Sequence, residues 1–430
     1  MQRTRLLVLV ATFAAVAAFV SITNGAASLS HNTPPPDQSD VSKTEDRTGP
    51  RGGYVVIGWN DLGMHCISPS FDKMAILPPY NNLMAQVIQK GNPPRIITSG
   101  VTVEYSIKGN TTVHNKTNFW QYVQPLFGVN PPEGIGLTGK GLAGLMDPVG
   151  DHFEAIGIPT VPKDDAFTFY PFQQGLLTVR DSYGSILATN DVTVPVSDEL
   201  HCDYCHYANG PGAPGINTGS IDGNILAVHD LREGTNLAAA TPVLCANCHA
   251  DNALGLPGTP GVESMSLAMH AKHSSVPTQP GCYDCHPGPQ TKCQRTNLEG
   301  MRPAGSNPRC ESCHGSLQNV ADTIRQGRQP WLQEPTCAQC HGNEFSTGST
   351  LYRNARGHGG MYCASCHNSP HAWWPSMLAL DNREPKNLQV SSSFLGHDHN
   401  CTACHTGTPS SSGGPHEGGG GDRARHRSSS

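Results

Sequence analysis

The chain has 430 residues and a formal net charge of −6, and only 14% of its residues are charged. This balance argues against a nucleic-acid-binding protein, because such a protein needs a basic face for phosphate contacts. Glycine (47) and proline (35) are frequent, which is typical of turns and loops rather than of long helices or strands. The length predicts two or three domains.

The first 27 residues have the pattern of a secretory signal peptide. Basic residues precede the apolar run LLVLVATFAAVAAFV at 6–20, and small residues follow at 25–27. A membrane-spanning helix needs about 20 apolar residues, and this run is shorter. We therefore expect an exported protein, periplasmic, extracellular or on the cell surface, with no membrane span after cleavage. The polar, proline-containing residues 28–52 predict a disordered linker.

Residues 53–197 have the pattern of an all-β domain. Apolar runs rich in β-branched residues alternate with clusters of Gly, Pro and Asn, as in antiparallel sheets. We predict an Ig-like β-sandwich. The expected strands are 54–59, 83–89, 95–107, 167–170, 175–181 and 185–196.

Within this region, the segment GWNDLGMHCISP contains Asp61, His65 and Cys66. These residue types occur in metal and nucleophile sites, but no further acid or base at a recognisable spacing completes a catalytic set. We expect a structural role for them, with ligation of an iron by His65 as the alternative.

The second half of the chain repeats the motif Cys-x-x-Cys-His seven times. Two thiols three positions apart on a helical turn each reach one vinyl group of a haem, and the next histidine then binds the iron as proximal ligand. The sequence therefore predicts seven covalently bound haem c groups. The attaching pairs are Cys202 and Cys205, Cys245 and Cys248, Cys282 and Cys285, Cys310 and Cys313, Cys337 and Cys340, Cys363 and Cys366, and Cys401 and Cys404; the proximal ligands are His206, His249, His286, His314, His341, His367 and His405.

Two other interpretations of the repeat fit less well. Tetrahedral zinc needs two Cys pairs or a Cys pair plus spaced histidines, and seven units do not divide that way. Redox-type disulfides do not require a histidine after every pair. Since successive motifs begin only 26 to 43 residues apart, residues 198–407 are expected to form a haem domain with little regular secondary structure and short helices, whose interior is largely porphyrin.

Each iron also needs a second axial ligand, and the region supplies enough histidines for all seven. We expect distal ligands among His201, His229, His270, His273, His358, His371 and His397, with His399 as the alternative to His397. The rival ligand is methionine, which raises the reduction potential, whereas two histidines keep it low. The candidates are Met265, Met269, Met301, Met361 and Met377, and we expect at most one to bind iron.

Cys66 and Cys293 are the only cysteines outside the motifs. In an oxidising compartment two spare thiols tend to pair, so we expect a Cys66–Cys293 disulfide that joins the β-domain to the haem region. The Gly/Ser-rich residues 408–430 predict a disordered tail.

The seven motifs, together with segments such as GHGGMYCASCHNSPHAWWP (357–375), resemble the bacterial multihaem c-type cytochromes of extracellular electron transfer. The segment NDLGMHCISPSFDKMAILPPYNNL (60–83) resembles a β-domain that accompanies such haem domains. The resemblance implies electron relay to other redox proteins or extracellular acceptors, with self-assembly into haem filaments as a known variant. The chain departs from some relatives in having no lipid-anchor cysteine and no lysine as proximal ligand.

We therefore predict an electron carrier rather than an enzyme. The alternative is a multihaem reductase of a small nitrogen or sulfur oxyanion, in which one iron keeps an open position. A third possibility is that the β-domain docks to a partner or to another subunit, with the haem region as the conduit. The supply of histidines favours the electron carrier.

Overall fold

The structure is a computed structural model that describes residues 49–50, 53–297, 310–338, 342, 347–348, 350–389, 393–396 and 400–407. The predicted signal peptide and tail lie outside these residues, as do 28–48 and 51–52 of the predicted linker. Five candidate site residues also lie outside them: Met301, Cys340, His341, His397 and His399.

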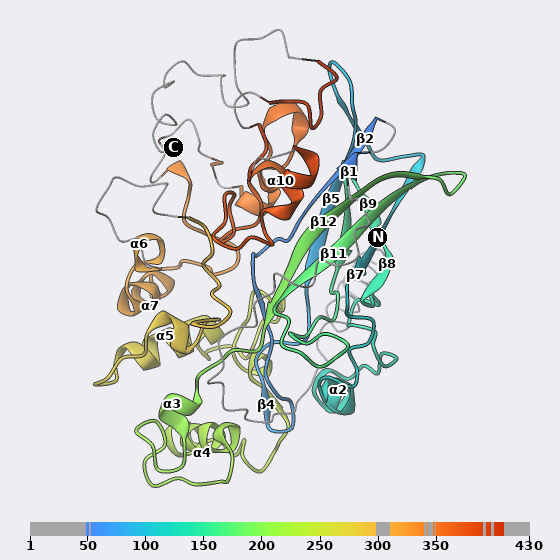
Figure 1. Cartoon of the computed structure of the whole chain (residues 1–430). Helices are drawn as coiled ribbons and strands as arrows, with labels where there is room; N and C mark the ends of the chain where they lie inside the picture. Colours follow the sequence, from blue (N-terminus) through green and yellow to red (C-terminus); the bar gives the residue numbers. More distant parts are fainter. Residues whose placement is uncertain are drawn as a thin grey trace, which may run out of the picture.

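Two β-sheets form the first part of the described chain (Figure 1). One has the order β1 (Gly49–Pro50), β12 (Ile186–Ser197), β11 (Phe172–Asp181), β7 (Val101–Ile107) and β8 (Ala143–Leu145), with β3 (His65–Cys66) parallel to the end of β12. The other has the order β2 (Tyr54–Trp59), β5 (Asn82–Gln89), β10 (His152–Ile156) and β9 (Asp147–Val149), with β6 (Arg95–Ile97) also on β5. Apart from β3, all pairs are antiparallel.

The two sheets share one hydrophobic core. Val56 and Val87 from one sheet are buried in the same cluster as Tyr105, Leu177 and Val194 from the other. These residues lie on the faces that the alternating pattern of the sequence turns inward. Substantial β-sheet in this region was predicted and is present.

Some local predictions were wrong. The expected strand at 167–170 is a turn, because Phe167 has a φ of 61° and the Asp164 carboxylate accepts hydrogen bonds from the backbone of Ala166 and Thr168. The linker was expected to be disordered throughout, but β1 pairs with β12. The helix α2 (Phe119–Phe127) was not predicted, because Pro125 lies inside it and the segment lacks a side-chain N-cap.

The region after residue 198 contains only short elements. They are α3 (Asp203–His206), α4 (Ile221–Glu233), β13 (Val243–Leu244), η2 (Cys245–Asn247), α5 (Met265–Ser274), η3 (Cys282–Asp284), α6 (Glu311–His314), α7 (Leu317–Arg325), η6 (Tyr352–Asn354), η7 (His358–Gly360), α9 (Cys363–His367) and α10 (Arg383–Leu388). Serine side chains cap the longer helices: Ser220, Ser264 and Ser316 accept hydrogen bonds at the starts of α4, α5 and α7. No helix within the described ranges has the length and apolar character that a membrane crossing requires.

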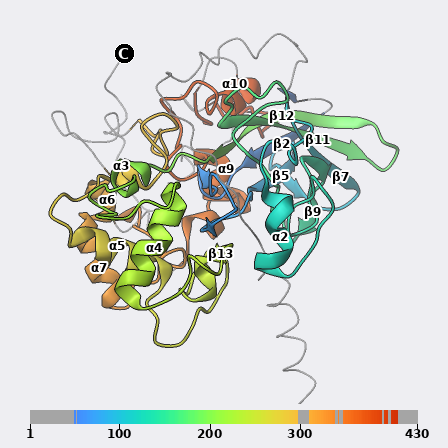
Figure 2. The same ribbon diagram turned by 90° about the horizontal axis from the view of Figure 1, so that it is seen from below.

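The two parts of the chain contact each other extensively. Helices α3 to α7 lie to one side of the sheets, whereas α9 and α10 pack against β2 and β12 (Figures 1 and 2). Val55 and Ile57 of β2 are buried with Leu388, and Trp59 is buried with Tyr362. At the other end, β13 pairs in parallel with β4 (Met74–Ala75). The sheets therefore serve as a support for the motif-bearing region.

Candidate functional site: paired histidines

Six of the seven Cys-x-x-Cys-His motifs, those that the structure describes in full, form helical turns, as their spacing predicts. In five of them the backbone N–H of the histidine donates to the backbone carbonyl of the first cysteine, at 2.8 to 3.0 Å between N and O. These are the motifs that end at His206, His249, His286, His314 and His405. A sixth motif forms the helix α9, Cys363–His367. Both cysteines and the histidine are thus held within about one turn of helix.

The structure pairs five motif histidines with five of the predicted distal histidines. The ring centres of each pair are 5.9 to 6.3 Å apart. The pairs are His206 with His273, His249 with His229, His286 with His270, His314 with His371, and His405 with His358.

This spacing fits a metal ion between the two rings. Imidazole nitrogens bind such metals at about 2.0–2.1 Å, so two rings on opposite sides of one ion have centres about 6 Å apart. The same distance, within 0.4 Å, recurs at five sites whose local backbones differ. The donor set at each site is two imidazoles and two adjacent thiols, which is the set that haem c requires.

Several of these imidazoles have one nitrogen already engaged. In α5, the Nδ1 of His270 lies 2.6 Å from the Ser266 carbonyl, and the Nδ1 of His273 lies 2.7 Å from the Met269 carbonyl. Likewise the Nδ1 of His249 lies 2.7 Å from the Glu263 carbonyl. A carbonyl only accepts, so it fixes the proton on Nδ1 and leaves Nε2 as a lone-pair donor for a metal.

These carbonyl partners of the histidines were not predicted from the sequence. In a helix over 265–274, each histidine lies one turn after the carbonyl that it contacts, so these two contacts follow once the helix is assigned. The Glu263 contact depends on the fold of the loop. Carbonyl partners of this kind orient a metal-binding imidazole and raise its basicity.

Burial favours the neutral form of three motif histidines. It lowers the pKa of His286 to about 4, with the nearby histidines 270, 314 and 371 adding to the effect. Burial also lowers the pKa of His206 and His314. A neutral imidazole is the form that binds a metal.

Three motif thiols are held protonated at neutral pH for the same reason. Burial raises the pKa of Cys202, Cys245 and Cys404 to about 12 in each case. A catalytic thiol needs a lowered pKa, so nothing in this environment favours a nucleophilic role.

The motif sites adjoin one another. Helix α5 supplies a partner both to His206 and to His286, so the first and third sites share a helix. After burial, the charge of a cysteine in another motif helps to raise the pKa of four motif thiols: Cys285 acts on Cys202, Cys310 on Cys282, Cys337 on Cys363, and Cys366 on Cys404. The first, third and fourth sites thus adjoin one another, and so do the fifth, sixth and seventh.

Other candidate ligands have different contacts. The Nε2 of His201 lies 3.1 Å from both a Glu199 carboxylate oxygen and the Gly288 carbonyl, and its ring stacks on Tyr204. The Nε2 of His65 lies 2.8 Å from the Asp61 carboxylate. In the described part of the chain, neither ring is paired with a motif histidine: that of His201 lies on Tyr204 and that of His65 beside Tyr80. Met361 packs with apolar residues of β2 and α10.

The predicted Cys66–Cys293 disulfide is not formed, and both thiols are free in the structure. They are nevertheless near each other, because the Cys293 charge contributes, after burial, to a raised pKa of Cys66. The Sγ of Cys293 lies 3.9 Å from the Nδ1 of His371.

Comparisons with protein-family models, with curated proteins and with solved structures gave no match for this chain. Within the residues that the structure describes, no three His, Cys, Asp or Glu side chains gather in the way that a directly bound metal ion requires. The candidate function therefore depends on the motifs and on the geometry of the histidine pairs.

Proposed function

We propose that this protein relays electrons through seven covalently bound haem c groups, most of them held by two histidines. When bound, haem c supplies an iron that accepts and donates single electrons. The cysteines of each motif would attach the group, the motif histidine would bind one face of the iron, and a distal histidine would bind the other.

The observation that carries this proposal is the set of five histidine pairs with ring centres about 6 Å apart. Two further features support it: the Nδ1 contacts that leave Nε2 available, and the adjacency of neighbouring motifs. Two imidazoles on each of these five irons would leave no open position there for a substrate, which favours electron transfer over reduction of a small oxyanion. The function does not require an acid or base from the protein.

We further propose that the two sheets are an Ig-like sandwich, that residues 198–407 are a multihaem cytochrome domain, and that the protein is exported. Its partners would be other redox proteins or an extracellular electron acceptor, and a filament of copies is one form such a relay takes. Docking of a partner through the sheets is compatible with this role, because α9 and α10 hold the sheets against the motif region.

Haem content tests the proposal. The intact protein, produced in a host that attaches haem c, should have the mass of the polypeptide plus seven haems, and its ferric spectrum should be dominated by low-spin iron. A folded chain without haem would contradict the proposal. A large high-spin fraction that binds nitrite would favour the reductase.

A further inference from the structure

A turn of the β-sheet domain contacts the segment that carries one of the paired histidines. The backbone N–H of Asn60 donates to the Ser369 Oγ at 3.2 Å. Gly63 is so close to Pro370 that a Cβ built on it would lie 1.7 Å from the Pro370 carbonyl oxygen. The next residue is His371, whose ring centre is 5.9 Å from that of His314.

The side chains of the motif Asn60–Cys66 fix the shape of this turn. The Asn60 Oδ1 accepts hydrogen bonds from the backbone N–H groups of Leu62 and Gly63, each at 3.0 Å. The Asp61 carboxylate lies 2.8 Å from His65 Nε2 and accepts a hydrogen bond from Asn82 Nδ2 at 2.8 Å. Asn60, Asp61 and His65 are all buried, so the turn is a rigid part of the domain.

The turn presents a carbonyl to the imidazole of His371. Burial lowers the pKa of His371 and the Arg295 charge lowers it further, whereas the nearby Leu62 backbone carbonyl acts to raise it. A backbone carbonyl beside the ring is a usual partner of a metal-binding imidazole.

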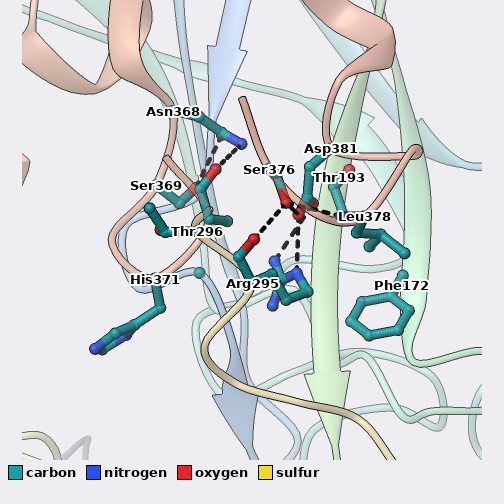
Figure 3. Close-up of polar contacts among 12 residues, drawn as sticks. Phe172, Thr193, Arg295, Thr296, Asn368, Ser369, His371, Ser376, Leu378 and Asp381 are labelled. Atoms are coloured by element: carbon teal, nitrogen blue, oxygen red, sulfur yellow. Dashed lines mark hydrogen bonds and ion pairs between the residues drawn. The ribbon is translucent and has the colours of Figure 1, made fainter. Parts of the chain in front are cut away.

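The carbonyl of His371 is held by backbone groups of Arg295 and Thr296, and the Arg295 side chain forms a buried ion pair with Asp381 (Figure 3). The N–H groups of Arg295 and Thr296 donate to the His371 carbonyl at 2.6 and 2.9 Å. The Arg295 Nε lies 2.8 Å from Asp381 Oδ2, and both side chains are almost fully buried. His371 itself has a φ of 63°, a conformation that a non-glycine residue adopts only when its surroundings impose it.

We propose that the Asn60–Gly63 turn is an outer part of the haem site at His371, where it positions the imidazole and lowers the reduction potential of the iron that this imidazole binds. The inference rests on the proposed haem function, and it gives the motif around Asp61 and His65 a role that the sequence alone did not reveal.

The direction of the effect follows from the Leu62 carbonyl. An imidazole whose N–H faces a carbonyl is a stronger electron donor, which stabilises ferric over ferrous iron. Displacing the turn that holds this carbonyl should raise the potential of this haem alone. A tenfold loss of the ferric preference corresponds to about 59 mV for one electron.

Gly63→Ala is the decisive variant and Gly100→Ala its matched control. Their φ angles are +73° and +74°, so alanine is equally strained at both, but only at Gly63 does a Cβ meet another atom within 4 Å. The measurement is a potentiometric titration of the full-length haem protein followed by electron paramagnetic resonance. The variant His371→Met identifies the signal of this haem.

We expect Gly63→Ala to raise the reduction potential of the haem identified by His371→Met by about 59 mV or more, which is a tenfold change in the equilibrium constant. The potentials of the other haems should stay unchanged. Gly100→Ala should leave all the potentials unchanged. If Gly63→Ala does not fold, Ser369→Ala replaces it, because it removes the acceptor of the Asn60 N–H and, besides that, only the Ser369 Oγ bond to the neighbouring Asn368 Oδ1. A smaller shift of the same signal is then expected. An unchanged signal, or an equal shift of all signals, would overturn the inference. A wild-type protein without haem would instead contradict the proposed function.

Discussion

Helix α5 offers a test of the histidine pairs, because it holds partners for two motif histidines. The ring centre of His270 is 6.2 Å from that of His286, and the ring centre of His273 is 6.3 Å from that of His206. Replacing His273 with alanine removes one of two imidazoles at one of seven sites. About one-seventh of the haem should therefore lose its low-spin signal, and the double variant His270→Ala/His273→Ala should lose about two-sevenths.

The assay is electron paramagnetic resonance of the ferric protein, with haem content measured in parallel. Haem content should stay constant, because the cysteines that attach the haem are unchanged. His201→Ala is the control, since its ring contacts Glu199, Gly288 and Tyr204 rather than a motif histidine. The reasoning would be refuted if His273→Ala left the low-spin signal intact, or if His201→Ala converted one haem to high spin.

Two further predictions concern the contacts between the two parts of the chain. Asp381→Ala leaves the buried Arg295 guanidinium without its carboxylate, so it should lower the free energy of unfolding in urea by about 3–5 kcal/mol. Asp322→Ala removes the partly exposed partner of Arg325 and should lower it by about 0–1 kcal/mol. Equal losses in the two variants would contradict this. Burial raises the pKa of Glu384 well above its ordinary value, so the folded state binds this proton more tightly and stability should fall as pH rises from about 4.3 through the raised pKa. Glu384→Gln keeps the oxygen that accepts from the Gly58 N–H and should remove that fall; a variant with the same pH dependence as wild type would contradict the assignment.

Local chemistry made much of the candidate site predictable. A Cys-x-x-Cys-His spacing is satisfied within one helical turn, so its geometry hardly depends on the rest of the fold. His270 and His273, both expected as distal ligands, are three residues apart and so share one face of a helix, and the structure places both opposite motif histidines. Which distal histidine faces which motif was not predictable, because the partners are separated by 16 to 67 residues in the sequence.

The sequence was less informative where tertiary contacts decide. The segment around Asp61 and His65 carries residue types that suggest chemistry, but its role depends on Ser369 and Pro370, about 300 residues away. His201 directly precedes a motif, yet the loop that brings Gly288 to it engages its Nε2. In the β-domain, alternation predicted β7 and β12, whereas the turn at Phe167 depends on a single carboxylate, that of Asp164.

The most direct measurement is the location of iron in the haem-loaded protein. An experimental map with the anomalous signal of iron should show a peak midway between the rings of each of the five histidine pairs, with a porphyrin joined to the two cysteines of the same motif. The account predicts that His206 and His273, for example, bind one iron from opposite sides. Iron bound elsewhere, or histidine pairs that are separated in the loaded protein, would contradict it.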